Sequence, residues 1–250
     1  MNPSYRQNQP GMWKKSGFTL LEVLMAVVIF AVIATIVYSA MNAAISRIGA
    51  IKDGDRVFAM GAGCLHRIST DLRSAYADPY PLFTPQNAEE NPDPYAFVGQ
   101  TDFVGGDSFS GLQFAAFAHL PVSTGSADPQ KSAAALAQLR YFVEKSPEPD
   151  RGYVLRRGDR PFVWNADADQ WDEDSAPVLC THITEFALTY FDHKKNDRKT
   201  WDSSDDATDY ATPAAVEIFF RIETDQGNYP FLTRVVLPAG REPLERVKSQ

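Results

Sequence analysis

The sequence predicts an α+β protein in which one long N-terminal helix precedes a largely antiparallel β region. Three observations support this prediction: an uncharged apolar run near the N-terminus, an apolar stripe with helical spacing after it, and a series of short alternating segments separated by turns. The chain has 250 residues, of which 44% are hydrophobic, so it can bury one good-sized domain and carry an appendage. A helix that covers one side of an antiparallel sheet gives the α+β class.

The first element is a predicted transmembrane helix. No charged residue occurs from 23 to 46, and no Gly or Pro occurs from 18 to 48. Residues 23–44 would form about 33 Å of helix at about 1.5 Å per residue, which is enough to cross a bilayer core. A cleaved signal peptide has a shorter apolar region that ends at an A-x-A-like site, and no strict A-x-A follows this run. A buried core helix is the other alternative, and we expect a membrane span over 18–46.

The charge distribution argues against one class of partner. Residues 1–17 carry +3, so the remainder carries −11, because a total of −8 less +3 leaves −11. An acidic body without a basic stripe binds phosphates poorly, so we expect no nucleic-acid partner. Three Lys or Arg residues precede the span and three follow it, so the positive-inside rule does not give its orientation. They are Arg6, Lys14 and Lys15 before it, and Arg47, Lys52 and Arg56 after it.

Glu22 is a lone carboxylate at the start of the apolar run. A charge at the centre of a membrane helix costs about 2.5–3.5 kcal/mol on insertion scales, and less toward an end. The side chain could reach the interface by snorkelling, which is a purely structural explanation. The functional alternative is that Glu22 pairs with a cation supplied by another chain.

After the span the helix is expected to continue to about residue 76, which makes residues 47–77 its second part. An apolar stripe with helical spacing supports this, and Asp78-Pro79 would end the helix. Residues 78–108 are rich in Pro, Asn, Asp and Gly, which predicts a long irregular stretch. The stripe consists of Ile48, Ile51, Phe58, Leu65, Ile68 and Leu72, and most of the neighbouring charged residues, Asp71 among them, fall between its members.

The remaining chain, within a β-rich domain at 78–250, reads as short strands. Two pairs of segments predict hairpins, one of them closed by a turn at 225–228, and the others are single strands. The expected strands are 111–117, 137–144, 152–157, 183–191, 215–222 and 231–237.

No catalytic constellation is found in the sequence, and we expect neither an enzyme nor a bound cofactor. The acidic tract with Asn165, Asp167 and Asp169 follows the first three ligand positions of a calcium loop. Its sixth position is Gln170 and its twelfth is Ala176, so it is not an EF-hand. A solvated acidic loop is the preferred interpretation, and a weak calcium site is the alternative.

The two cysteines, Cys64 and Cys180, have no metal-ligand spacing. In an oxidising compartment they could form a disulfide. The sequence favours the simpler interpretation that they are separate buried residues.

Residues 14–23, KKSGFTLLEV, resemble the processing signal of type IV pilins and related proteins. The resemblance implies that a prepilin peptidase cuts between Gly17 and Phe18, and that the new amine of Phe18 is N-methylated. It implies that Lys14 and Lys15 hold a leader, residues 1–17, at the cytoplasmic face, and that Glu22 meets such an ammonium on a neighbouring subunit. A start at Met12 would give a leader of more usual length, and the sequence does not choose between Met1 and Met12.

The order of elements in the body is similar to that of the minor pseudopilin J family of type II secretion systems. The most telling stretch runs from Val178 to Ile222, with I-T-E-F-A-L-T-Y-F-D, a Trp and then P-A-A-V-E-I. The family implies a pilin-like fold, a single-pass anchor in the bacterial inner membrane and a periplasmic body. It implies I- and K-type subunits as partners at the filament tip, H- and G-type filament subunits, and contact with secreted cargo. The alternative is a minor type IV pilin-like tip subunit for adhesion or pilus assembly.

Overall fold

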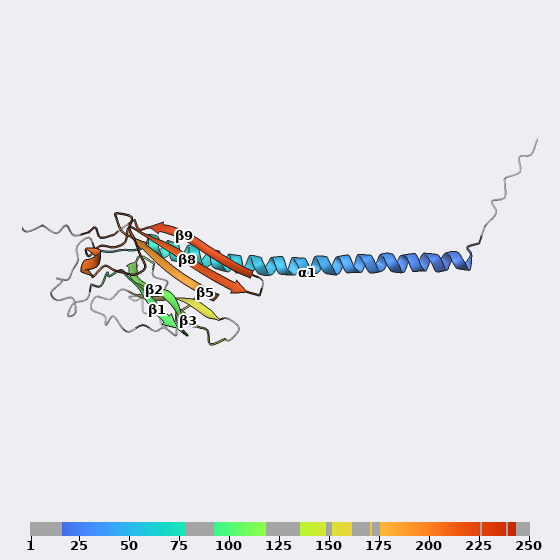
Figure 1. Cartoon of the computed structure of the whole chain (residues 1–250), viewed down its shortest axis with the longest axis horizontal. Coiled ribbons are helices and arrows are strands. Elements are labelled where there is room, and N and C mark those ends of the chain that lie inside the picture. Colours follow the sequence, from blue (N-terminus) through green and yellow to red (C-terminus); the bar gives the residue numbers. More distant parts are fainter. Residues whose placement is uncertain are drawn as a thin grey trace, which may run out of the picture. The chain divides into compact units, whose positions relative to one another are not determined.

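The structure is a computed structural model. It describes residues 17–78, 93–118, 136–148, 152–161, 171, 176–225, 227–238 and 240–243, with the side chains of 46–53 excluded. The chain divides into two compact units, Met1–Ile51 and Lys52–Gln250. Helix α1, Leu20–Arg73, contributes residues to both units, and each unit is described by itself (Figure 1).

The first unit contains the N-terminal part of α1. Its segment Leu20–Ile45 has 26 residues with a mean hydropathy of 2.9, and none of its most apolar window is buried within the chain. By length and composition this segment can cross a membrane. Within the described part of the chain these apolar side chains remain exposed, which agrees with the expected span and supports membrane association.

The second unit is built on one antiparallel sheet of nine strands. The strand order is β7-β1-β2-β3-β4-β5-β8-β9, and β6 pairs with β5 beside this path. Every pair is antiparallel. The strands are β1 Val98–Val104, β2 Asp107–Ala116, β3 Ala137–Lys145, β4 Tyr153–Pro161, β5 Val178–Phe191, β6 Asp197–Arg198, β7 Trp201–Asp202, β8 Ala215–Thr224 and β9 Gly227–Val236.

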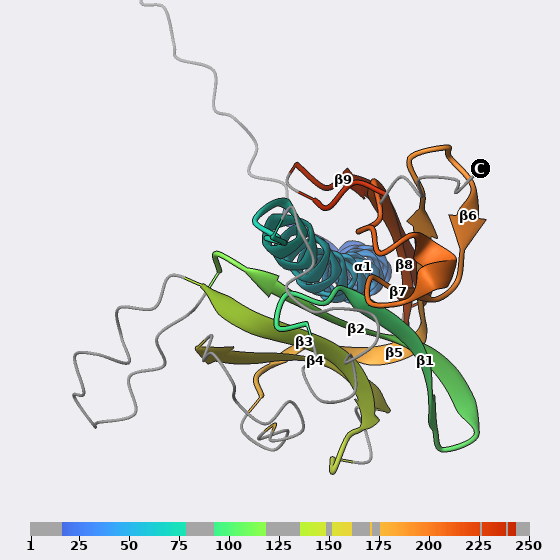
Figure 2. The same ribbon diagram turned by 90° about the vertical axis from the view of Figure 1, so that its left-hand side faces the viewer.

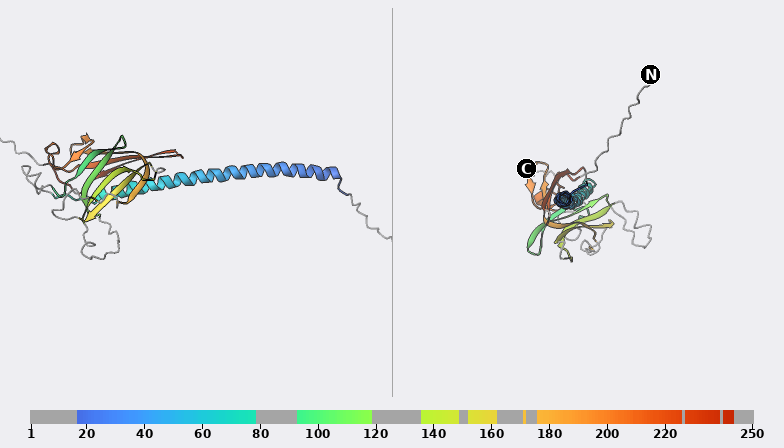
Figure 3. Two further views of the ribbon diagram at one scale, coloured as in Figure 1. Left: turned by 90° about the horizontal axis from the view of Figure 1, so that it is seen from below. Right: turned by 90° about the vertical axis from the view of Figure 1, so that its right-hand side faces the viewer.

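The sheet curls around the part of α1 that belongs to the second unit. Figure 2, viewed along the helix, shows β8 and β9 on one side of this teal segment and β2 to β4 on another, and Figure 3 shows the arrangement from two further sides. Ile68 and Leu72 of the helix are fully buried and share one core with Tyr141 and Phe220 of the sheet. The α+β fold with a helix on an antiparallel sheet is therefore confirmed.

One close contact depends on a glycine in α1. A Cβ atom at Gly61 would lie 2.2 Å from Cζ of Phe231 in β9, which is closer than any real contact. The Phe231 ring is buried and stacks on Phe220, with ring centroids 5.0 Å apart. Gly61 therefore lets the aromatic layer of the sheet reach the helix backbone.

Several element bounds differ from the expected ones, most of all at the helix end and at β1. The helix ends at Arg73 instead of 76, because Ala75 already forms a β-bridge to Ala116. Strand β1 lies within the stretch that was expected to be irregular. The expected hairpins β3–β4 and β8–β9 are confirmed. In the helical stripe, Phe58 is 61% exposed, although its ring centroid lies 5.7 Å from that of Phe231 in β9, and the buried positions of the helix include Cys64, which was not in the expected stripe.

Candidate functional site

The N-terminal end of α1 holds the residues expected to be processed. Gly17, Phe18 and Thr19 have no regular secondary structure, and the helix begins at Leu20. The Thr19 hydroxyl accepts a hydrogen bond from the backbone N–H of Glu22 at 3.3 Å. The Thr19 carbonyl oxygen accepts the N–H groups of Glu22 and Val23, at 3.1 and 3.3 Å. Thr19 is thus the N-cap, because it satisfies donors that the first helical turn leaves free.

The Gly17–Phe18 peptide bond is open to approach. A Cβ atom added to Gly17 would meet nothing within 4 Å, and the Phe18 side chain is 80% exposed. The bond lies immediately before the N-cap, so cleaving it would not disrupt a helical hydrogen bond. Lys14 and Lys15, the expected leader charges, lie outside the described residues.

Glu22 lies in a sequence pattern for helix capping that the sequence analysis missed. Thr19-Leu20-Leu21-Glu22 has the T-x-x-E pattern of a capping box, in which a Glu side chain at the third helical position favours the helix start. Glu22 is also an acid in the first turn, where the helix dipole favours negative charge. The side chain is exposed, and no cation among the described residues pairs with it. A carboxylate here is therefore compatible with helix formation and still available to another chain.

Comparison with protein families gives a match at the N-terminus. Residues 14–38 match the family model of the prokaryotic N-terminal methylation motif. No curated protein matches the chain. The matched motif and the apolar helix that it overlaps support a type IV pilin-like or pseudopilin-like protein, and the motif suggests processing by a prepilin peptidase and assembly with other pilin-like subunits.

In the body, a buried ionic cluster ties the end of α1 to the sheet. Asp71 is fully buried, and its Oδ2 accepts hydrogen bonds from the Tyr141 hydroxyl at 2.5 Å and from Arg157 Nε at 2.6 Å. Arg67 pairs with Asp71 Oδ1 at 2.9 Å, and Arg157 Nη1 pairs with Asp159 at 2.7 Å. Two acids and two arginines balance within the cluster, which is what the low dielectric of the interior requires. Asp71 lies between Ile68 and Leu72 of the stripe, as expected, but its carboxylate is buried with them.

The cluster changes the acid–base chemistry of Tyr141. Burial, and then the charge of Asp71, raise the pKa of Tyr141 well above its usual range. The tyrosine therefore remains protonated and serves as a hydrogen-bond donor to the carboxylate. This arrangement stabilises one position of the helix end on β3 and β4, and it offers no exposed reactive group.

A second buried ion pair anchors the C-terminal segment. Arg241 Nη2 lies 2.7 Å from Asp93 Oδ2, and both side chains are fully buried. The Arg241 backbone N–H donates to the Thr212 hydroxyl at 2.9 Å, and its Nε donates to the Asp78 carbonyl at 3.0 Å. Segments before β1, before β8 and after β9 are thereby held together.

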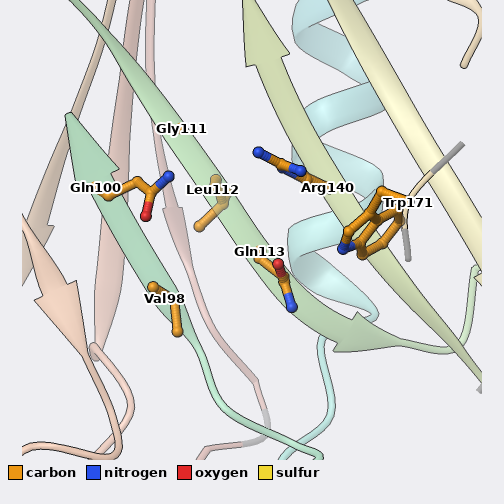
Figure 4. Close-up of a pocket in the computed structure, with 7 residues that line it drawn as sticks. All are labelled: Val98, Gln100, Gly111, Leu112, Gln113, Arg140 and Trp171. Atoms are coloured by element: carbon orange, nitrogen blue, oxygen red, sulfur yellow. The ribbon is translucent and has the colours of Figure 1, made fainter. Parts of the chain in front are cut away.

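The face of the sheet that turns away from α1 carries a small pocket across β1, β2 and β3 (Figure 4). Its volume is about 200 Å³, below the roughly 300–1,000 Å³ of typical small-molecule sites. Trp171 covers one side, where its ring packs over Gly158 and under the Arg160 guanidinium, 4.5 Å from the ring centroid. The lining residues are Val98, Gln100, Gly111, Leu112, Gln113, Arg140 and Trp171. The pocket is too small and too polar to define a ligand.

The structure describes the two cysteines but not the residues of the alternative calcium site. Asn165, Asp167 and Asp169, the alternative calcium ligands, lie outside the described residues. Among the residues that the structure describes, no three His, Cys, Asp or Glu side chains are grouped to hold a metal ion. Cys64 and Cys180, by contrast, are brought together from 116 positions apart, as described below.

Proposed function

We propose that this chain is a minor pseudopilin of a type II secretion system, a structural subunit at the tip of the periplasmic filament that helps to start its assembly. The observation that carries the proposal is the methylation motif at 14–38, followed by an exposed apolar helix and a body with one curled antiparallel sheet. The similarity of Val178–Ile222 to the J family supports the finer assignment. The subunit itself performs no chemistry.

In this proposal a prepilin peptidase in the membrane cuts between Gly17 and Phe18 and the new amine of Phe18 is methylated. The open space around Gly17 supports access for the peptidase. Lys14 and Lys15 keep the leader at the cytoplasmic face, an orientation that comes from the resemblance to the pilin-like signal, since equal numbers of Lys and Arg flank the span. The span then anchors the subunit in the inner membrane, and the body lies in the periplasm.

Glu22 is the proposed assembly charge. Methylation leaves the Phe18 amine positively charged, and the exposed Glu22 carboxylate of a neighbouring subunit would pair with it during assembly. A desolvated ion pair adds little net stability, but a misplaced one leaves two charges unpaired in the hydrocarbon. The pair would therefore fix the axial position of one subunit against the next.

The partners follow from this role. They are I- and K-type pseudopilins at the tip, H- and G-type subunits in the filament, the prepilin peptidase and, at the tip, secreted cargo. The test is co-purification of the full chain from membranes that contain I- and K-type pseudopilins. We expect a stable complex with both, and the tip proposal is wrong if neither is recovered. Recovery with type IV pilus subunits instead would support the alternative of a minor pilin.

The role of Glu22 has a sharper test, because two variants separate its charge from its capping role. Glu22→Gln keeps a side chain that suits a capping box and removes the charge, whereas Glu22→Ala removes both. We expect both variants to be cleaved at Gly17 and both to be poorly incorporated into the complex. If Glu22→Gln is incorporated normally and only Glu22→Ala is not, Glu22 acts as a helix cap and the pairing with Phe18 is refuted.

A further inference from the structure

We propose that Cys64 and Cys180 form an intramolecular disulfide that locks α1 onto β5, and that the oxidation state of the pair is set while the chain folds. The proposal rests on the proposed function in one respect, which is that export provides an oxidising compartment. It goes beyond that function because it assigns a covalent modification to the body and not to the N-terminus.

Cys64 and Cys180 face each other across the interface between helix and sheet. Cys64 is 3% exposed and lies on the side of α1 that also buries Ile68, one turn further on. Cys180 is 1% exposed in β5, and both cysteines belong to the same core. Both are free thiols in this structure, and Cys180 is close enough to Cys64 to raise the pKa of its thiol.

A second contact fixes the same alignment of α1 against β5. The Thr181 hydroxyl lies 3.7 Å from Sδ of Met60. Met60 precedes Cys64 by one helical turn, and Thr181 directly follows Cys180. The helix turn and the strand are thus held in register at two successive positions, so the thiols meet through the docking of two elements and not through the mobility of one side chain.

The reaction needs a disulfide donor, such as a disulfide-carrying oxidoreductase or oxidised glutathione. The thiolate of one cysteine attacks the donor disulfide and releases one donor thiol, which leaves a mixed disulfide. The second cysteine, after loss of its proton, displaces the other donor sulfur. The protein pair loses two protons and two electrons, and the donor becomes two thiols.

In the folded structure the disulfide is slow both to form and to be reduced. Only a thiolate attacks a disulfide, and contact with Cys180 together with burial raises the pKa of Cys64, so this thiol stays protonated. Neither sulfur is accessible to a donor once α1 covers β5. The bond therefore forms while the helix docks on the sheet and a donor can still reach the sulfur atoms, and the closed core then protects whichever state was reached.

The bond would enclose a large part of the body. The segment between the two cysteines contains 115 residues, with β1 to β4 and both members of the buried Asp71–Arg157 pair. A loop of this size loses much conformational freedom in the unfolded chain when it is cross-linked. For a domain of this size the expected rise in melting temperature is on the order of 10 °C.

The test counts thiols in the full chain. The chain is exported, purified in detergent without reductant, alkylated, unfolded and probed with a maleimide of high mass. We expect no free thiol before reduction and two after it, with no cross-link between chains, and a melting temperature about 10 °C lower after unfolding, reduction and refolding. Cys64→Ser and Cys180→Ser are the matched controls, and each should show one free thiol. Two free thiols in the exported wild-type chain overturn the proposal.

A second experiment separates this proposal from the proposed function. The full chain is refolded in detergent with oxidised glutathione, and again with dithiothreitol. We expect the intramolecular bond in the first sample, and two thiols that react slowly until the chain is unfolded in the second. This result does not require a secretion system, so it would stand if no pseudopilin partner were found. Two free thiols after oxidative refolding would overturn the pairing even if the partners were confirmed.

Discussion

The two parts of α1 show how one helix can serve two environments. Residues 20–45 are mostly apolar and exposed, and among the described residues none of their most apolar window is buried. In residues 54–73 the helix presents one face to the sheet, with Cys64, Ile68 and Leu72 buried and Phe58 exposed. The first part depends on a bilayer or on neighbouring helices, while the second part carries its partner within the same chain.

The two parts also use glycine differently. The span has none, which favours an uninterrupted helix, whereas the body part has Gly54, Gly61 and Gly63. A Cβ atom at Gly54 would lie 3.2 Å from the Tyr229 hydroxyl, and one at Gly61 would overlap Phe231. The body part thus gives up helix propensity where the sheet approaches closely, and a span without a fixed partner has no such need.

The largest expected effect is the loss of processing at the N-terminal end of α1, with the fold of the body unchanged. Gly17→Trp should abolish processing, because a bulky side chain at the cleaved bond obstructs the peptidase while the space around Gly17 spares the fold. The N-terminus of membrane-extracted protein is read by mass spectrometry. Gly17→Ala, which adds one methyl group into the same open space, is the control with the smallest added bulk. A mature Gly17→Trp chain that still begins at Phe18 would refute the assigned site.

The next effect is a loss of stability where the body part of α1 is held on the sheet. Asp71→Asn removes a fully buried carboxylate and leaves Arg157 without its principal partner, which should lower the free energy of unfolding by about 3–5 kcal/mol. Asp55→Asn is the matched control on the exposed side of the same helix, and its effect should stay within about 0.5 kcal/mol. Denaturant unfolding of both variants measures the difference. Equal stabilities would mean that the cluster does not hold the helix on the sheet.

A pair of glycine variants sharpens the comparison within the body part. Gly61→Ala and Gly63→Ala gain the same helix propensity, about 1 kcal/mol, so this contribution cancels between them. Only Gly61→Ala forces a methyl group against Phe231, since a Cβ atom at Gly63 meets nothing within 4 Å. Overpacking costs about 1–3 kcal/mol, so Gly61→Ala should be less stable than Gly63→Ala by that amount. If Gly61→Ala were the more stable variant, the close approach of the sheet would be disproved.

The fold could be predicted largely because its signals are local. The alternation in β3, β8 and β9 and the apolar span can each be recognised from a few consecutive residues. Strand β1 was missed because Pro, Asp and Gly dominate its surroundings, although Gly105-Gly106 is a signal for a two-residue hairpin turn. Both glycines have positive φ, +62° and +100°, and Val104 pairs with Asp107 across them.

The candidate sites also divide into those with a local sequence signal and those without one. Gly17, Phe18 and Glu22 form one contiguous motif, and the T-x-x-E pattern at Thr19 could have revealed the helix cap. Asp71 and Arg157 are 86 positions apart, and Cys64 and Cys180 are 116 apart. No periodicity or spacing connects such residues, because only the curl of the sheet around the helix brings them together. The sequence therefore contains no sign that Asp71 is buried in an ion pair.

The last expected effect is a change in the stability of the body at high pH. Variants of two buried tyrosines should show which side chain causes it. Burial raises the pKa of Tyr141 and of Tyr190, so the folded chain keeps protons that the unfolded chain loses near pH 10. Their contribution to stability is complete below about pH 10 and declines as the pH rises toward the folded pKa, by up to about 1.4 kcal/mol per pH unit for each tyrosine.

The corresponding phenylalanine variants should separate the two tyrosines. Tyr141→Phe should flatten the decline above pH 10 and also lower stability at pH 7 by about 1.5–3 kcal/mol, because it removes a hydrogen bond to the charged Asp71. Tyr190→Phe should flatten the decline without loss at pH 7, because among the described residues its hydroxyl has no hydrogen-bond partner. Chemical unfolding at pH 7 and from pH 9 to 11 measures both variants. An equal loss at pH 7 in both would show that Asp71 gains nothing from Tyr141, and the cluster would then hold α1 through Arg157 and Arg67 alone.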